Sequence, residues 1–402
     1  MARRPLDPIS QRIAAVQERF QRLTQAGLYY YNLPVAELRG GSRVVVGGRE
    51  LGMYASYSYL GLLGHPRIAA AAKEAVDKFG TGTHGVRLLA GTLTLHRELE
   101  KAIADFKDTE DAVTFSSGYV TNLTLVSTLL GRRDVVLCDK LNHASIVDGC
   151  LLSGAKFWRF RHNDTGDLER LLRKAPASAA KLVAVDAVFS MDGDIIDLPA
   201  VASLCQRYGA WLMVDEAHSL GVLGKGGHGI EEHFGLRDAI DFKMGTLSKA
   251  IPSVGGYVAG RRDLISYLRH TARAYIFSAA LPPAQAAAAK EAIAIICDEP
   301  ERVERLQHNS QRFLSGLKSA GFDTLLSQTA IVPILCGEDE QAFQMTRACH
   351  EQGMFVLPVV SPAVPEGLAR LRATVTAAHE PAEIDEAVEL LARAGRSVGV
   401  LS

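Results

Sequence analysis

Gly245-Thr246-Leu247-Ser248-Lys249, with Gly255-Gly256 shortly after it, is the stretch of this chain that carries the most information about its fold. A lysine amine can form a Schiff base with an aldehyde. The hydroxyls of Thr246 and Ser248 can donate to a phosphate, and the glycines let the backbone come close to a ligand. A solvated lysine would also fit these five residues, so the interpretation depends on the surrounding sequence.

An acidic residue precedes this lysine at the end of a buried strand. The apolar run Ala210 to Val214 is typical of a parallel strand, and Asp215 follows it, 34 residues before Lys249. Carboxyl ends of strands in open α/β sheets face the crevice where ligands bind. A lysine Schiff base with an aspartate on a pyridinium nitrogen is the site of pyridoxal phosphate, so the two motifs together predict this cofactor. His218 is expected to reach the ring hydroxyl or the substrate; otherwise it is an ordinary loop histidine.

Short apolar runs alternate with helical stretches through the middle of the chain. The runs are Ala112 to Phe115, Val135 to Cys138, Leu182 to Val185, Trp211 to Val214 and Phe242 to Met244. This alternation predicts an α/β fold with a mainly parallel, doubly wound sheet.

Three further segments supply candidates where strands of this sheet end. Ser117-Gly118-Tyr119 opens a helix whose free N–H groups and positive dipole suit a phosphate, although N-capping explains the serine equally well. His143 can stack on a planar ring or cap the following helix. Ser190 ends another run and points into the crevice. Asp192 and Asp194 behind it lack the remaining ligands of a calcium loop, so no metal site is expected.

The pattern changes along the chain and predicts three parts. An N-terminal arm with a Gly-Gly hairpin occupies residues 1–50, and a large domain with the sheet occupies 51–283. Pro282-Pro283 marks the next boundary, and residues 284–402 form a small α+β domain. Its expected helices lie near 300–319, 340–352 and 381–394, and its expected strands are Ile331 to Leu335, Phe355 to Leu357 and Leu371 to Val375.

Between the hairpin and the sheet the sequence predicts one more strand and two helices. Tyr57 and Tyr59 alternate with Ser58, and together with Tyr54 they are typical of a half-buried strand. Helices are expected over 66–79 and 93–106, the second capped by Thr92 or Thr94. The loop Gly80 to Arg87 is glycine-rich but lacks nucleotide-binding spacing.

The composition excludes several classes of function. The chain has 402 residues, 44 basic and 45 acidic side chains, a balance that does not favour nucleic acid as a partner. No stretch reaches the roughly 18 apolar residues of a transmembrane segment, so a cytoplasmic protein is expected. The six cysteines are scattered without metal-ligand spacing and are expected to be reduced thiols of the core.

Taken in order, the motifs resemble the α-oxoamine synthases, a branch of the fold-type I pyridoxal phosphate enzymes with the aspartate aminotransferase-like fold. The matching segments are Ser116 to Asn122, Asn142 to Gly149, Phe189 to Asp194, Val214 to Ser219, Gly245 to Ala250 and Phe277 to Pro283. Within the family the chain most resembles bacterial serine palmitoyltransferase, through Ser56-Tyr57, Arg159 to Asn163 and Ala394 to Val400. Asp186 to Ser190 and Asn142-His143 are closer to the glycine- and alanine-using relatives.

The resemblance implies a role for each candidate. Lys249 would form the Schiff base and later transfer protons, Asp215 would pair with the pyridine nitrogen, and His143 would stack on the ring. The residues implied at the ring oxygen are His218 and Ser190, those at the phosphate are Ser117, Gly118, Tyr119 and Thr246 with Ser278 of the partner subunit, and those at the substrate are Tyr57 and Arg372. Family members are homodimers with shared sites.

The implied reaction is a decarboxylative Claisen condensation of a small amino acid with an acyl thioester. Serine, alanine and glycine stay open, as do coenzyme A and acyl carrier protein as carriers, and the activities of 2-amino-3-ketobutyrate CoA ligase and 8-amino-7-oxononanoate synthase. Val360 stands where relatives carry a carboxylate-binding arginine, which leaves Arg372 as the matched guanidinium. An aminotransferase on the same fold and a non-catalytic partner subunit are two rival functions, and the presence of Lys249 argues against the second.

Overall fold

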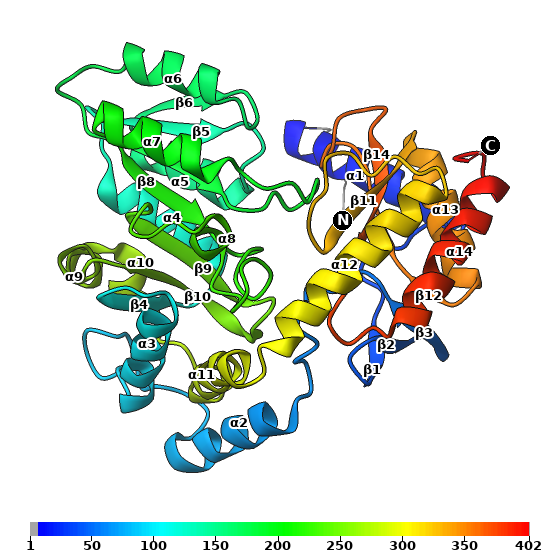
Figure 1. Cartoon of the computed structure of the whole chain (residues 1–402), viewed down its shortest axis with the longest axis horizontal. Coiled ribbons are helices and arrows are strands. Elements are labelled where there is room, and N and C mark those ends of the chain that lie inside the picture. The colour runs from blue at the N-terminus through cyan, green and yellow to red at the C-terminus, as the bar shows by residue number, and fades with distance from the viewer. Residues whose placement is uncertain (1–6, 402) are drawn as a thin grey trace.

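The apolar runs in the middle of the chain assemble into one sheet with the strand order β4-β10-β9-β8-β7-β5-β6 (Figure 1). The structure is a computed structural model and describes residues 7–401. The strands are β4 (Asp111–Phe115), β5 (Val135–Asp139), β6 (Lys156–Phe160), β7 (Lys181–Asp186), β8 (Trp211–Asp215), β9 (Phe242–Ser248) and β10 (Pro252–Gly260). The pairings β6–β5, β5–β7, β7–β8 and β8–β9 are parallel, whereas β10 is antiparallel to β4 and β9. The predicted α/β fold with a mainly parallel sheet is therefore confirmed.

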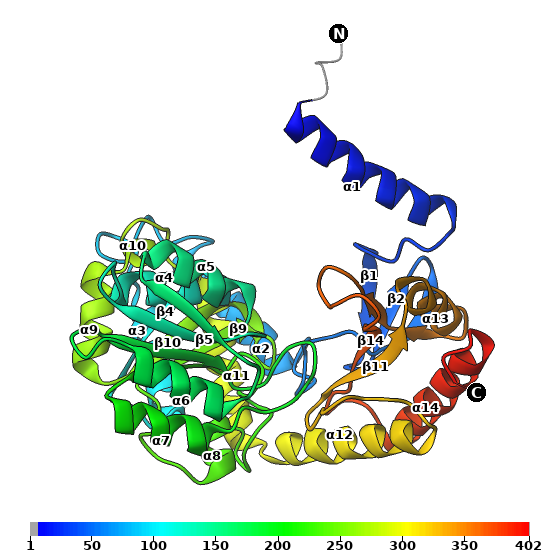
Figure 2. The same ribbon diagram turned by 90° about the horizontal axis from the view of Figure 1, so that it is seen from above.

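Helices cover both faces of this sheet, as Figure 2 shows. Alternate residues of β5 point to opposite faces, and two hydrophobic cores result: Val136 and Cys138 belong to one, Val135 and Leu137 to the other. The helices on the first face are α4 (Gly118–Leu129), α5 (Ala144–Ser153), α9 (Arg262–Thr271) and α10 (Arg273–Ile276). Those packed with the second core include α2 (Pro66–Phe79), α3 (Thr94–Phe106), α6 (Thr165–Lys174), α7 (Leu198–Tyr208), α8 (Ile230–Phe234) and α11 (Pro283–Asp298).

The C-terminal part has its own sheets. Strands β11 (Ile331–Gly337), β14 (Ala369–Thr374) and β13 (Leu357–Val359) form an antiparallel sheet, and α12 (Glu301–Ser319), α13 (Asp339–Glu351) and α14 (Pro381–Ser397) pack around it. Figure 1 shows α12 bridging the two parts. The N-terminal hairpin, β1 (Val35–Arg39), β2 (Arg43–Val46) and β3 (Arg49–Met53), lies with this C-terminal part, because β3 pairs with β12 (Met354–Phe355). The two boundaries between the three predicted parts stay predictions, and the first six residues of the arm lie outside the described residues.

Helix α1 (Pro8–Gln25) is largely exposed and contacts the C-terminal part through Arg19, which donates to the Ser361 carbonyl at 2.7 Å. Figure 2 shows it projecting away from both parts, and none of its residues is buried. Its apolar residues share one face, and they are exposed: Ile9 by 66%, Ile13 by 53%, Val16 by 55% and Phe20 by 38%. None of the helices between residues 7 and 401 combines the length and apolar character that a bilayer crossing requires.

Two local predictions are wrong. Residues Tyr54 to Tyr59 form a loop after β3 rather than a strand, because each buried tyrosine has its own distant partner: the Tyr54 hydroxyl donates to the Glu383 carbonyl at 2.8 Å. Neither threonine caps α3. Thr92 Oγ1 instead donates to the Arg87 carbonyl, and the N-cap residue is Leu93.

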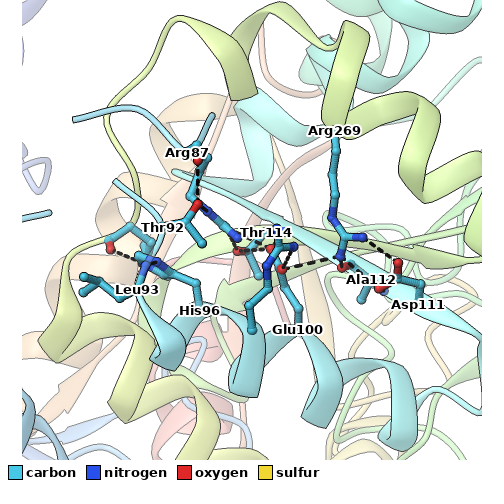
Figure 3. Close-up of polar contacts among 11 residues, drawn as sticks. Arg87, Thr92, Leu93, His96, Glu100, Asp111, Ala112, Thr114 and Arg269 are labelled. Atoms are coloured by element: carbon cyan, nitrogen blue, oxygen red, sulfur yellow. Dashed lines mark hydrogen bonds and ion pairs between the residues drawn. The ribbon is translucent and has the colours of Figure 1, made fainter. Parts of the chain in front are cut away.

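A buried ionic network anchors the glycine-rich loop to the sheet (Figure 3). Arg87 Nη1 lies 2.9 Å from Glu100 Oε1 of α3, with 3% and 2% of the two side chains exposed. The same carboxylate accepts the Thr114 N–H of β4 at 3.1 Å, and Arg269 of α9 pairs with Asp111 at 2.6 Å. Because buried charges need partners, the network fixes the position of β4, whose end leads to Ser117.

Candidate active site

A cavity of about 270 Å³ opens at the carboxyl ends of the parallel strands. Its polar and charged lining residues are Ser117, Gly118, Tyr119, Asn122, His143, Ser145, Asp186, Ser190, Asp215, His218, Thr246, Ser248 and Lys249. The structure thus brings together most of the residues that the sequence singled out. The cavity lies where open α/β sheets bind their ligands.

A larger cavity of about 580 Å³ lies between α12 and the loop that follows His218. Its lysine, Lys225, and its histidine, His233, are exposed. Glu232 accepts the Gly226 and His228 N–H groups at 2.9 Å each, so this carboxylate stabilises a turn. The smaller cavity is the candidate site because its ionisable groups are buried and lie close together.

Lys249 lies directly after β9, with its amine in the cavity. Nζ is 2.7 Å from His218 Nε2. Burial lowers the pKa of Lys249 to about 8, against the opposing charges of Asp215 and Asp186. A lysine with this pKa is partly neutral near neutral pH, and the neutral amine is the nucleophile.

His218 is held between this lysine and a buried tyrosine. Its Nδ1 lies 2.6 Å from the Tyr59 hydroxyl. Burial, and then the charge of Lys249, lower the pKa of His218 well below its usual value, while burial raises the pKa of Tyr59. When the Lys249 amine is neutral, the Tyr59 hydroxyl can donate to Nδ1 while the imidazole hydrogen on Nε2 donates to Nζ. The ammonium form of Lys249 instead donates to Nε2.

Asp215 ends β8 and is 5% exposed. Its Oδ2 accepts from Asn122 Nδ2 at 2.6 Å, and its Oδ1 accepts the Ala217 N–H at 2.9 Å. Beside it at the end of β7, Asp186 accepts the His143 N–H at 2.8 Å. Burial, and then the charge of Asp215, raise the pKa of Asp186 well above its usual value.

His143 caps helix α5, as one of its two interpretations predicted. Nδ1 accepts the Ser145 N–H at 3.3 Å and lies 2.7 Å from Ser145 Oγ. Burial lowers the pKa of His143, so the ring is neutral. Because the same ring lines the cavity, capping leaves it available to a ligand.

The first turn of α4 faces the cavity from the other end. Ser117 Oγ accepts the Val120 N–H at 3.2 Å, so it caps the helix as its second interpretation predicted. A Cβ on Gly118 would lie 3.0 Å from Thr246 Oγ1, which shows how closely β9 approaches this turn. Thr246 Oγ1 donates to the Gly255 carbonyl at 3.0 Å and lies 2.8 Å from Ser248 Oγ. Free N–H groups, a helix dipole and hydroxyls form an anion site here.

The C-terminal part contributes a guanidinium at the opposite rim. Arg372 of β14 donates through Nε to the Ser190 carbonyl at 2.7 Å and through Nη1 to Thr374 Oγ1 at 3.0 Å. Its Nη2 is buried and has no partner among residues 7–401. The guanidinium carbon lies 4.8 Å from the ring centre of Tyr57, and Lys249 Nζ lies 5.6 Å from the same ring. The two residues predicted to bind substrate therefore lie together, next to the lysine.

Ser278 is not brought to this cavity within the chain. It is partly buried in the segment between α10 and α11, and its hydroxyl contacts only the neighbouring Ala279 carbonyl, at 3.5 Å. Val360 is buried, with 5% exposed.

Four residues with close contacts in the site were not among the candidates predicted from the sequence: Tyr59, Asn122, Ser145 and Asp186. Asp186 carried a usable signal, because it ends an apolar run as Asp215 does. Asn122 lies inside a helix and Tyr59 inside the wrongly predicted strand, so only the folded structure reveals their partners.

The residues present fit pyridoxal phosphate. A buried carboxylate, a lysine amine of lowered pKa and a helix N-terminus with hydroxyls line one cavity. This is the set of groups that a pyridinium nitrogen, an aldehyde and a phosphate require. The unpaired Nη2 of Arg372 is a donor for an additional anionic group.

Comparison with known proteins gives concordant results. The model of the class I and II aminotransferases matches residues 54–391. The 8-amino-7-oxononanoate synthase of Geobacter sulfurreducens is 47% identical over 384 residues, which cover 95% of this chain and 98% of that protein. Serine palmitoyltransferase of Sphingobacterium spiritivorum is 43% identical over 373 residues, or 93% of each protein.

Solved structures of the same two kinds of enzyme, from other organisms, are also similar to this chain. A serine palmitoyltransferase from S. paucimobilis, solved with pyridoxal phosphate and myriocin, has a TM-score of 0.95 at 37% identity and covers 98% of this chain and 100% of that one. The 8-amino-7-oxononanoate synthase from Francisella tularensis has a TM-score of 0.74 at 27% identity, covering 86% of this chain and 98% of that one. The predicted fold is thus confirmed over almost the whole chain.

Proposed function

The chain belongs to the α-oxoamine synthases of the fold-type I pyridoxal phosphate enzymes, and we propose that it condenses a small amino acid with an acyl thioester and releases carbon dioxide. The observation that carries the proposal is the contact of Lys249 with His218 at 2.7 Å, in one cavity with the buried Asp215. The cofactor is pyridoxal phosphate. When bound, it supplies the electron sink that makes the α-carbon of an amino acid acidic.

Each residue of the site has a defined task in this proposal. Lys249 would hold the cofactor covalently, and its amine, when free, would accept the α-proton of the amino acid. Asp215 keeps the ring nitrogen protonated, and Asn122 orients that carboxylate. His143, which lines the cavity, would stack on the ring of the bound cofactor. The groups at the ring oxygen are His218 and Ser190, and those at the phosphate are Ser117, Gly118, Tyr119 and Thr246.

The substrate carboxylate binds at the rim. The Nη2 donor of Arg372 is buried without a partner among residues 7–401, and a guanidinium is suited to a carboxylate. Tyr57 packs against the same guanidinium and completes this subsite. Val360 removes the second arginine of the relatives, so Arg372 carries most of the carboxylate recognition.

We favour a serine palmitoyltransferase-like condensation. The high structural similarity to that enzyme and the Tyr57–Arg372 pair support it. The second candidate, 8-amino-7-oxononanoate synthase activity, is supported by the slightly higher sequence identity to that enzyme. An aminotransferase remains the rival outside the family's chemistry.

A homodimer with shared sites is part of the proposal. The exposed apolar face of α1 suits a partner subunit, and Ser278 lies away from the cavity of its own chain, where only a second copy could use it for phosphate binding. Five of the six free cysteines are buried, whereas Cys297 is exposed, so the prediction of core thiols is wrong for Cys297. Free thiols, with acyl-CoA or acyl carrier protein as donor, fit the cytoplasm, where thiols stay reduced.

A substrate panel tests the proposal. Purified protein with pyridoxal phosphate is incubated with serine, alanine or glycine and with acyl-CoA or acyl carrier protein thioesters of different length. Release of free thiol together with carbon dioxide from one pair supports a condensation and identifies both substrates. Amino transfer to a keto acid without thiol release would instead establish an aminotransferase. Lys249→Ala is the control, and it should bind no cofactor covalently.

A further inference from the structure

A histidine outside the cavity bridges two carboxylates behind it. His162 follows β6 in the segment Arg159 to Asn163. Its Nδ1 lies 3.0 Å from Asp139 Oδ1, and its Nε2 lies 2.9 Å from Asp194 Oδ2. The aspartate side chains are 0% and 6% exposed, whereas the histidine side chain is 25% exposed.

Both contacts require a hydrogen on each ring nitrogen, so the imidazole is the charged form. Burial alone would lower the pKa of His162. The hydrogen bonds to Asp139 and Asp194 outweigh it and raise this pKa to about 10. A single cation thus lies between two buried carboxylates and offsets the charge of one of them, and charge-assisted hydrogen bonds of this kind are stronger than neutral ones.

The first carboxylate holds the loop that carries His143. Asp139 ends β5, and its two oxygens accept the Leu141 N–H at 2.8 Å and the Asn163 N–H at 2.7 Å. His143 lies two residues beyond Leu141. Asp139 therefore fixes the segment that leads to His143, and His162 supplies the positive charge beside the Asp139 carboxylate.

The second carboxylate belongs to the loop that carries Ser190. The Phe189 N–H donates to the Asp194 carbonyl at 3.1 Å, and the Gly193 N–H donates to the Phe189 carbonyl at 2.8 Å, so the loop is a closed turn. The Phe189 ring packs edge-on against His162 with 4.4 Å between ring centres. His162 therefore contacts both ends of this turn.

The C-terminal part holds the same turn from its other side. Arg372 donates to the Ser190 carbonyl at 2.7 Å, and Arg370 pairs with Asp192 at 2.7 Å. The acidic residues Asp192 and Asp194 therefore both serve ion pairs. The Ser190 turn is therefore held from two sides, by His162 of the large domain and by Arg370 and Arg372 of the C-terminal part.

We propose that His162 is a positioning residue that fixes the His143 loop and the Ser190 turn against the cofactor without contacting the cofactor. The inference rests on the proposed function in one respect, because it takes His143 and Ser190 as groups that face pyridoxal phosphate. It explains the segment Arg159 to Asn163, which no step of the proposed mechanism uses.

Variants of His162 and of its partner Asp194 test the proposal. His162→Gln removes the charge, and Asp194→Asn removes one of its two partners. The readouts are the dissociation constant of pyridoxal phosphate from titration of the visible absorbance, and kcat and KM at saturating cofactor. We expect cofactor binding to weaken by roughly tenfold in each variant, the effect of about 1.4 kcal/mol of lost hydrogen bonding. We also expect kcat to fall while KM for the amino acid changes little.

Two further variants separate positioning from general stability. His228→Gln is the matched control, because His228 also packs on a phenylalanine at 4.4 Å but binds only a backbone carbonyl. It should keep wild-type cofactor affinity. His162→Arg, which restores the charge and two-sided donors, should recover most of the lost affinity.

The outcomes distinguish failure of the proposed function from failure of the positioning role of His162. If wild-type protein takes up no pyridoxal phosphate, the proposed function fails. If it does, and His162→Gln lowers only the melting temperature while cofactor affinity and kcat stay unchanged, the positioning role is overturned. Failure of His162→Arg to recover affinity above that of His162→Gln also contradicts it.

Discussion

Burial shifts the pKa values of the ionisable side chains in the cavity in the directions that their tasks require. The pKa of Lys249 falls to about 8, which frees its amine near neutral pH. The pKa of His218 falls well below its usual value, which keeps this histidine neutral, and the pKa of Asp186 rises.

The pKa of Lys249 can be read from cofactor uptake. Only the neutral amine attacks the aldehyde, so the rate of uptake by the cofactor-free protein should rise with pH and level off above about 8. Stopped-flow absorbance between pH 6.5 and 10 measures it, with Lys249→Arg as a control that forms no linkage. An inflection near the ordinary lysine value of about 10.4 would contradict the assignment.

Tyr59 is predicted to control the tautomer of His218. Tyr59→Phe leaves Nδ1 in a buried place without its hydroxyl partner, and an unsatisfied buried group costs about 1–3 kcal/mol. We expect kcat to fall by roughly tenfold, because Nε2 no longer has a fixed hydrogen. Tyr257→Phe is the matched control, since the Tyr257 hydroxyl is also buried but has no partner among residues 7–401. Equal loss of activity in both variants would exclude the tautomer role.

The charge on His162 should be visible in the pH dependence of stability. The groups that face this ring are Asp139 and Asp194, and its folded pKa of about 10 lies above the unfolded value of about 6.5. The folded chain therefore binds the extra proton between these values, and the stabilisation, complete below pH 6.5, is lost as pH rises toward 10. The difference in unfolding free energy between wild type and His162→Gln should shrink over this window. A difference that stays constant with pH would contradict the charged state.

Sequence reasoning could predict Lys249, Asp215 and His218 because each follows an apolar strand or a small-residue motif. It could not predict Tyr59, which contacts a histidine 159 residues away. It also left both interpretations of His143 open. The structure shows that capping and lining the cavity are compatible for this ring.

At the scale of elements, the buried parallel strands were predictable, since strands covered on both faces are continuously apolar. Edge strand β6 has the sequence Lys-Phe-Trp-Arg-Phe, which gives no such run, and it was missed. The Tyr54 to Tyr59 segment shows the opposite error. Its buried tyrosines, Tyr54 and Tyr59, make separate contacts with Glu383 and His218 and do not belong to a pleated sheet.

Helix α1 is predicted to stabilise a dimer. Its exposed apolar residues share one face, and burying that face against a second copy would stabilise association. Ile13→Asp with Val16→Asp should shift the protein toward monomers in sedimentation experiments at low concentration. Ala14→Asp with Ala15→Asp adds the same charge to other faces of α1 and is the control. Unchanged association in the first double variant would show that the interface lies elsewhere.

At the scale of the whole molecule, the site depends on contacts between distant parts of the chain. Strand β14 belongs to the C-terminal sheet. Its Arg372 nevertheless donates to the carbonyl of Ser190, which lies in the part with the seven-stranded sheet, at 2.7 Å. The N-terminal hairpin lies with the C-terminal sheet through β3 and β12. Sequence patterns predicted each of these parts separately. They did not predict that Tyr57 and Arg372 come into contact where the parts meet.

Substitution of Arg372 tests whether this meeting point binds the amino acid. Arg372→Lys keeps a positive charge but loses the planar fork that fits a carboxylate. We expect KM for the amino acid to rise by roughly tenfold or more, the effect of one lost charge-assisted hydrogen bond. Steady-state kinetics at saturating pyridoxal phosphate and acyl thioester measures this change.

A variant of the neighbouring Arg370 is the control, because it weakens the contacts that hold the Ser190 turn and leaves Arg372 unchanged. Arg370 lies on the same strand, and its guanidinium already binds Asp192 of that turn and the Leu368 carbonyl. Arg370→Gln should therefore change KM for the amino acid much less than Arg372→Lys does. If the two variants raised KM equally, Arg372 would act by supporting the turn. The carboxylate would then need another donor, because Val360 offers none.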